Sequence, residues 1–125
     1  MTEQDRKLAS RAYLFYLLNI TFLPGLGFLL QILLWHQTRS LCLAFASAHA
    51  RQSVLASITA GVLLTAVTGL ILFIGSWTSP YTWVVLILYF TLCHTTLILL
   101  GVVAYARSNG GKTFSPFHVK TWWAE

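Results

Sequence analysis

The sequence predicts an all-α integral membrane protein: two full transmembrane helices, preceded by a Pro/Gly-broken segment that forms a re-entrant hairpin or a kinked span. Hydrophobic residues make up 57% of the 125 residues and charged residues only 9%, whereas a soluble domain carries about 25% charged residues. Residues 52–106 contain no Lys, Arg, Asp or Glu. That stretch is long enough for two spans and a turn, so residues 1–125 are interpreted as one membrane domain of three to four hydrophobic helices.

The first elements are a polar lead, residues 1–11, and an interrupted apolar segment, residues 12–35. Pro24, Gly25 and Gly27 form the predicted hinge, because proline removes a helical hydrogen bond and glycine relaxes the backbone. As a helix, the apolar stretch before Pro24 would reach only about 18 Å, roughly half of a hydrocarbon core of about 30 Å. The segment therefore either turns back as a re-entrant hairpin or crosses once as a kinked span.

The next elements are the two full transmembrane helices. Residues 40–75 are predicted to form an interfacial start that continues into a span, and Thr38 or Ser40 offers an N-cap. A tight uncharged turn with two aromatic residues follows, as is typical of a membrane interface. Residues 83–106 then form the second apolar helix, and residues 107–125 form a basic tail that begins with a helix stop.

The distribution of Lys and Arg residues predicts how the chain is oriented in the membrane. The formal net charge of +5 comes from the ends and loops, which indicates contact with anionic head groups rather than with nucleic acid. In the hairpin arrangement all eight Lys and Arg residues share one face, so the positive-inside rule favours that arrangement. We therefore expect a multi-pass protein of the cell inner (plasma) membrane with cytoplasmic basic termini, membrane lipid as a partner, and Trp122 and Trp123 as an interfacial anchor.

A ridge of small and polar residues recurs every four positions along the first full span. Its members are Ser57, Gly61, Thr65 and Gly69. Residues four apart share a helix face, and small residues allow helices to approach closely in lipid. The ridge is interpreted either as packing against the last helix or as a seam for self-association or a polar pathway.

Two further features carry polar side chains. His49, Arg51 and Gln52 open the first full span, where they are predicted to have a structural or binding role. His94 lies at the midpoint of the last helix, and an ionisable residue inside a span is a functional candidate. It either bonds to a facing hydroxyl or ligates haem or a metal together with His49 or His36.

Several chemistries lack the residues they need. The three acidic residues lie at the chain ends, so no predicted span contains a carboxylate for proton coupling or for magnesium-phosphate chemistry. No serine lies beside a plausible base, and no zinc spacing occurs. We therefore expect no enzyme activity, no metal and no cofactor.

Three stretches in order resemble one family. They are residues 23–28 (LPGLGF), residues 48–53 (AHARQS), similar to a HARQA motif, and residues 106–114 (ARSNGGKTF). The chain resembles, over residues 13–118, small bacterial membrane proteins similar to the chloroplast inner-envelope import channel component. The resemblance implies a compact helical membrane domain, of which the plastid members serve in protein import. Residues 114–117 depart from the aromatic-basic-aromatic-Pro run usual there, which puts a shared ligand at the tail in doubt.

These observations predict a non-enzymatic integral membrane protein that self-associates or serves as a subunit of a larger membrane complex. The first alternative is an oligomeric pore or carrier for a small solute or peptide, with the small-residue ridge and His94 along its path. The second alternative is a redox protein that binds haem or a metal through His94. The expected partners are copies of the chain or other membrane protein subunits.

Overall fold

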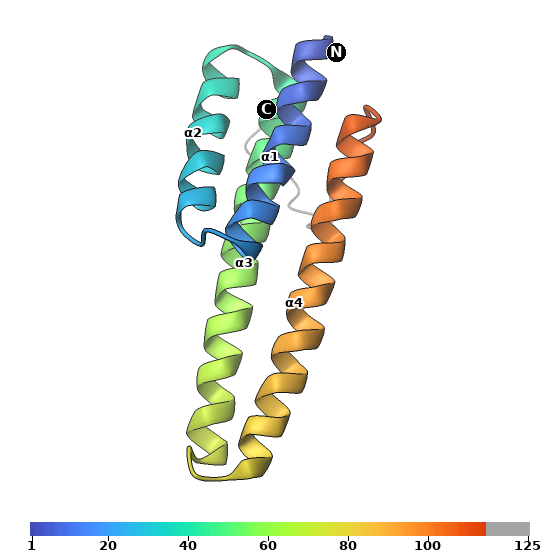
Figure 1. Cartoon of the computed structure of the whole chain (residues 1–125). Coiled ribbons are helices and arrows are strands. Elements are labelled where there is room, and N and C mark those ends of the chain that lie inside the picture. Colours follow the sequence, from blue (N-terminus) through green and yellow to red (C-terminus); the bar gives the residue numbers. More distant parts are fainter. Residues whose placement is uncertain (115–125) are drawn as a thin grey trace, which may run out of the picture.

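The computed structural model describes residues 1–114, which form four helices and no strand. The helices are α1 (Glu3–Thr21), α2 (Leu26–Ser40), α3 (Ala44–Gly75) and α4 (Pro80–Asn109). Consecutive helices run in opposite directions, so α1 and α3 begin at the same end of the molecule as α2 and α4 finish (Figure 1). The all-helical class is therefore confirmed for the described residues.

The first two helices form a short hairpin. The polar lead, residues 1–11, belongs to α1, and the apolar segment is divided by a turn at residues 22–25. The chain reverses there, so α1 and α2 lie antiparallel rather than as one continuous kinked helix (Figure 1). Gly25, at φ 90°, supplies the left-handed backbone conformation from which α2 starts. Insertion of this hairpin into a membrane stays a prediction.

The last two helices form a much longer hairpin. At 32 and 30 residues, α3 and α4 are about 48 and 45 Å long, and both are long and apolar enough to cross a membrane. The two predicted spans are thus confirmed as candidates by length and composition. The helices are tied by Tyr89, whose hydroxyl donates to the Leu63 carbonyl at 2.6 Å, and by Thr82, which donates to the Gly75 carbonyl.

The boundaries of α3 differ from the sequence expectation. The helix predicted over residues 40–75 begins at Ala44, because α2 continues to Ser40 and the chain turns through Cys42 at φ 53°. Thr38 and Ser40 therefore do not cap it: their hydroxyls donate to carbonyls within α2. The helix predicted over residues 83–106 extends at both ends, and Pro80 occupies its first turn. The predicted anchor, Trp122 and Trp123, lies outside the described residues.

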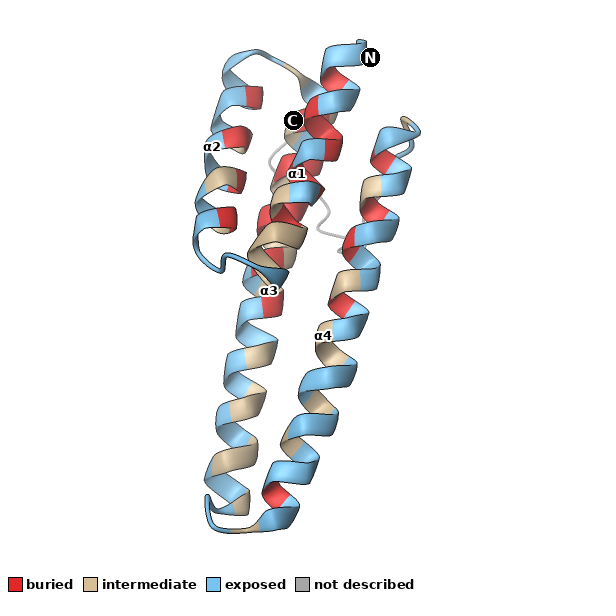
Figure 2. Cartoon of the chain, in the orientation of Figure 1, coloured by how far each residue is buried: buried red, intermediate tan, exposed pale blue. Residues whose placement is uncertain are grey.

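Burial is concentrated in the half of the molecule where α1 and α2 pack beside the long hairpin (Figure 2). Four of the six buried residues that form the core there are alanines. The six are Leu8, Ala9, Ala12, Leu34, Ala46 and Ala50. In the other half α3 and α4 have only each other, and large apolar side chains such as Phe73 and Ile87 are exposed. Such a surface fits lipid rather than water.

Candidate functional site

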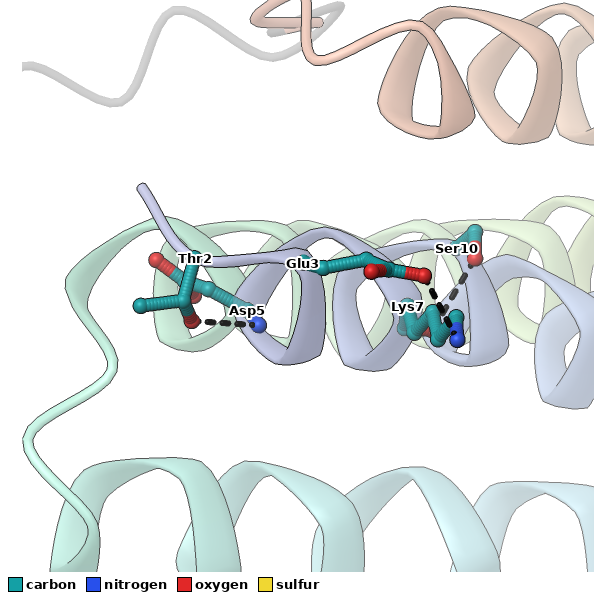
Figure 3. A network of polar contacts seen from close by, with 5 residues as sticks. All are labelled: Thr2, Glu3, Asp5, Lys7 and Ser10. Atoms are coloured by element: carbon teal, nitrogen blue, oxygen red, sulfur yellow. Dashed lines mark hydrogen bonds and ion pairs between the residues drawn. The ribbon is translucent and has the colours of Figure 1, made fainter.

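The basic residues gather in the half that holds the core. In the described part of the chain they are Arg6, Lys7, Arg11, Arg39, Arg51, Arg107 and Lys112, close to the ends of four helices that meet there. The opposite end of the molecule is the loop 76–79, which carries no charge. Lys7 pairs with Glu3 at 2.7 Å on the surface, and its ammonium group lowers the pKa of the Glu3 carboxyl (Figure 3).

Asp5 links the first helix to the third. Its Oδ1 accepts a hydrogen bond from the Ala46 amide at 2.7 Å, and the carboxylate is buried. A carboxylate is favourable at a helix N-terminus, because the first amides have no partner within the helix and the dipole is positive there. Asp5 is itself placed by Thr2, whose hydroxyl accepts from the Asp5 amide at 3.1 Å (Figure 3). A residue of α1 thus performs the capping expected of Thr38 or Ser40.

His49 is held by the first helix. The Tyr13 hydroxyl lies 3.0 Å from Nδ1 of His49, and the Phe45 ring is 4.4 Å away between centroids. Both members of the Tyr13–His49 pair are buried. Phe114, in the tail of residues 107–125, packs edge-on against Tyr13. The tail thus adds an aromatic contact to this group.

Gln52 and Arg51 have different surroundings. Gln52 is buried and faces a cavity of about 20 Å³ between α1, α3 and α4, which Tyr16 and Phe114 also line. The cavity has room for about one water molecule, not for an organic substrate. Arg51 is half-buried, and its Nε has no partner among the described residues. Of the predicted group, His49 and Gln52 therefore lie in the interior of the protein, and Arg51 lies at the edge of that interior.

Asn19 organises the turn between the first two helices, and the sequence reasoning missed it. Its Oδ1 accepts from the amides of Gly25 at 2.9 Å and Phe28 at 3.2 Å, and its Nδ2 lies 3.4 Å from the Ser57 hydroxyl of α3. A Cβ at Gly27 would lie 2.5 Å from the Asn19 backbone nitrogen. Among the residues of the predicted hinge, Gly27 is thus the one that lets α1 and α2 approach each other closely. The available signal was the amide side chain of Asn19 in the apolar stretch shortly before Pro24.

Gln31 was also missed. It is fully buried in α2, yet neither amide atom has a hydrogen-bond partner within residues 1–114. An unpaired buried amide typically costs about 1 to 3 kcal/mol, so the contact of α2 with the rest of the core is weaker than its burial suggests.

The small-residue ridge is divided by the end of the first hairpin. Ser57 is buried beside Asn19, whereas Gly61, Thr65 and Gly69 are exposed. A Cβ at Gly61 or Gly69 would meet no atom within 4 Å. Among residues 1–114, therefore, no close helix contact is made at either glycine.

His94 lies apart from His36 and His49, the other histidines that the structure describes. Its ring stacks on Phe90 at 5.2 Å, and its buried Nδ1 has no partner in the described part of the chain. No contact joins it to His49 or to the exposed His36, and residues 1–114 hold no group of three His, Cys, Asp or Glu side chains placed for a metal ion.

One comparison with known proteins identifies a family. Residues 4–121 match the model of the magnetosome magnetite crystal formation protein family. No curated protein and no solved structure matches the chain. The expected resemblance to bacterial relatives of the chloroplast import channel is therefore wrong: the matching family is a different one, and short motifs in apolar sequence did not separate the two.

Proposed function

Because this chain belongs to the magnetosome magnetite crystal formation protein family, we propose that it is a non-enzymatic magnetosome membrane protein that acts in crystal formation as an assembled scaffold. The observation that carries the proposal is the exposed strip on α3 below the first hairpin, formed by Gly61, Thr65 and Gly69. In this proposal copies of the chain, or other membrane subunits, associate through that strip.

The strip has the features of a helix contact in lipid. Association of helices in a bilayer depends on close packing, which small residues spaced four apart permit, and on hydrogen bonds such as a threonine hydroxyl can add. Gly61 and Gly69 leave open space where a side chain would stand, and Thr65 lies between them. A second α3 therefore has room to approach at the backbone of the first.

The orientation gives the scaffold two different faces. With the basic ends cytoplasmic, the opposite side presents the loop 76–79, in which the hydroxyls of Ser76 and Thr78 lie 3.2 Å apart. An assembly would repeat this loop across the membrane surface, and we propose that the repeated hydroxyl groups face the growing crystal. The carrier and redox alternatives have no comparable support, since His94 contacts Phe90 and neither His36 nor His49 among the described residues.

Replacing Gly61 with leucine tests the assembly. The variant is expected to fold, because an added Cβ meets nothing within the chain, but to associate more weakly. Overpacking typically costs about 1 to 3 kcal/mol, which corresponds to association weaker by about fivefold to about a hundredfold. The measurement is the assembled mass in detergent by light scattering, with Val62→Phe on the neighbouring exposed position as control. Unchanged assembly of Gly61→Leu, with loss of assembly in Val62→Phe, would show that the strip is not the contact.

A further inference from the structure

Below the first hairpin, an open groove runs between α3 and α4. Its volume is about 700 Å³, and its walls are mainly apolar. Leu64 and Thr68 line it from α3, and Trp83, Leu86, Phe90 and Thr91 line it from α4. No described side chain of α1 or α2 lines this part of the long hairpin.

The groove continues the surface on which α1 packs. Higher along α4, Tyr16 donates to the Leu97 carbonyl at 3.1 Å, and a Cβ at Gly101 would lie 2.6 Å from the Tyr16 ring. Phe90 precedes Leu97 by seven residues, two helical turns, so it lies on the same face of α4. A helix thus fills one half of this α3–α4 surface, and the other half is open.

The open half corresponds to one leaflet of a membrane. From Trp83 to Thr91 the helix rises about 12 Å, compared with about 15 Å for half of the hydrocarbon core. Trp83 stands one turn beyond the loop 76–79, where the exposed Trp77 and Tyr81 suit interfacial depth. The groove therefore opens into the leaflet on the side of that loop.

The first hairpin restricts what the groove can hold. A transmembrane helix of a partner cannot follow it across the membrane, because α1 occupies its continuation, where Tyr16 meets Leu97 and Gly101 of α4. A second copy that entered the groove itself would meet the first hairpin, which stands out from α3 and α4 by about one helix diameter of 10 Å, whereas the assembly contact proposed above is centred on Gly61 at the edge of α3, outside the groove. An acyl chain, by contrast, is flexible, apolar and limited to one leaflet.

From this geometry we infer that the groove binds one acyl chain of a phospholipid from the leaflet on the side of the loop. The loop carries no Lys or Arg, so the site selects the chain and not an anionic head group. Two residues of the proposed assembly strip, Thr65 and Gly69, also line the groove, whereas Gly61 does not. The inference requires that α3 and α4 lie in a membrane. It does not require that the chain assembles.

Native mass spectrometry of the full chain, titrated in detergent with dioleoyl phosphatidylcholine, tests the site. Thr91→Phe fills the groove from α4, and Thr68→Phe fills it from α3. Thr96→Phe is the matched control, since Thr96 is also an exposed threonine of α4 but does not line the groove. We expect one retained lipid per wild-type chain, at least about tenfold weaker retention in both groove variants, and unchanged retention in Thr96→Phe.

Each other outcome overturns the inference. Equal lipid retention in all four proteins means that the lipid binds elsewhere, and absence of a retained lipid from the wild type means that the groove has no defined occupant. A fall in assembled mass in the groove variants, without a change in lipid, assigns the groove to a second copy. The Gly61→Leu result is independent of these outcomes, because Gly61 does not line the groove.

Discussion

Replacing Gly27 with alanine is expected to destabilise the protein by about 3 kcal/mol, the largest effect of any single methyl group in the first hairpin. The added Cβ would lie 2.5 Å from the backbone nitrogen and 2.6 Å from the Cα of Asn19, so α1 and α2 must separate to admit it. Separation would also lengthen the hydrogen bonds from Gly25 and Phe28 to the Asn19 side chain. Thermal unfolding in detergent, followed by circular dichroism, measures the loss.

Gly61→Ala is the matched control for this substitution. Both glycines are helical, but a Cβ at Gly61 meets no atom within 4 Å. Alanine is the better helix former by about 1 kcal/mol, so Gly61→Ala should leave stability unchanged or raise it slightly. If Gly27→Ala were as stable as Gly61→Ala, the close approach of α1 to α2 would be wrong.

Removal of the Asp5 carboxylate is expected to cost about 2 kcal/mol. Asp5→Ala leaves the buried Ala46 amide without its acceptor, at the positive end of a 32-residue helix. Asp5→Asn retains an oxygen that can accept the same bond and should lose less than Asp5→Ala. The readout is again the unfolding midpoint in detergent.

Glu3→Gln provides the control for Asp5. Glu3 is also an acidic residue in the first turn of α1, but within residues 1–114 it pairs only with Lys7, and both side chains are mostly exposed. Such surface pairs contribute little, so its loss should change stability by less than about 0.5 kcal/mol. Equal effects of Asp5→Ala and Glu3→Gln would contradict the capping of α3 by Asp5.

The elements that depend on local sequence could be predicted. Absence of charge over residues 52–106 marked both long helices, and the Pro24–Gly25 pair marked the break, because these signals act within a few residues. The position of the α3 start could not be predicted, since its cap comes from Asp5, 41 residues away. The favoured hairpin placed the starts of both helices on one face, but the sequence does not pair Asp5 with the Ala46 amide.

The candidate site was predicted only in part. The structural or binding role expected of His49 and Gln52 stays a prediction. The structure places both in the interior, and Tyr13, the partner of His49, lies on a helix whose packing the sequence does not give. The ridge was predicted as one surface, yet the first hairpin covers Ser57 and ends above Gly61. Because α1 ends at Thr21, close to the predicted break, it covers Ser57 and leaves Gly61, Thr65 and Gly69 open. The sequence did not predict that α1 packs along this face of α3.

The central claim is that the start of α1 and the turn between α2 and α3 lie on one side of the membrane and that only α3 and α4 cross it. Labelling with a membrane-impermeant maleimide tests this with three single-cysteine proteins, in intact and then permeabilised spheroplasts of a host that forms no magnetosomes and carries the chain in its plasma membrane. Cys42 reports the turn between α2 and α3, Gln4→Cys reports the start of α1, and Ser79→Cys reports the distal loop. We predict that Ser79→Cys reacts in intact spheroplasts, whereas Gln4→Cys and Cys42 both react only after permeabilisation. Reaction of Gln4→Cys and Cys42 from opposite sides would contradict the account, because residues 12–35 would then cross the membrane once.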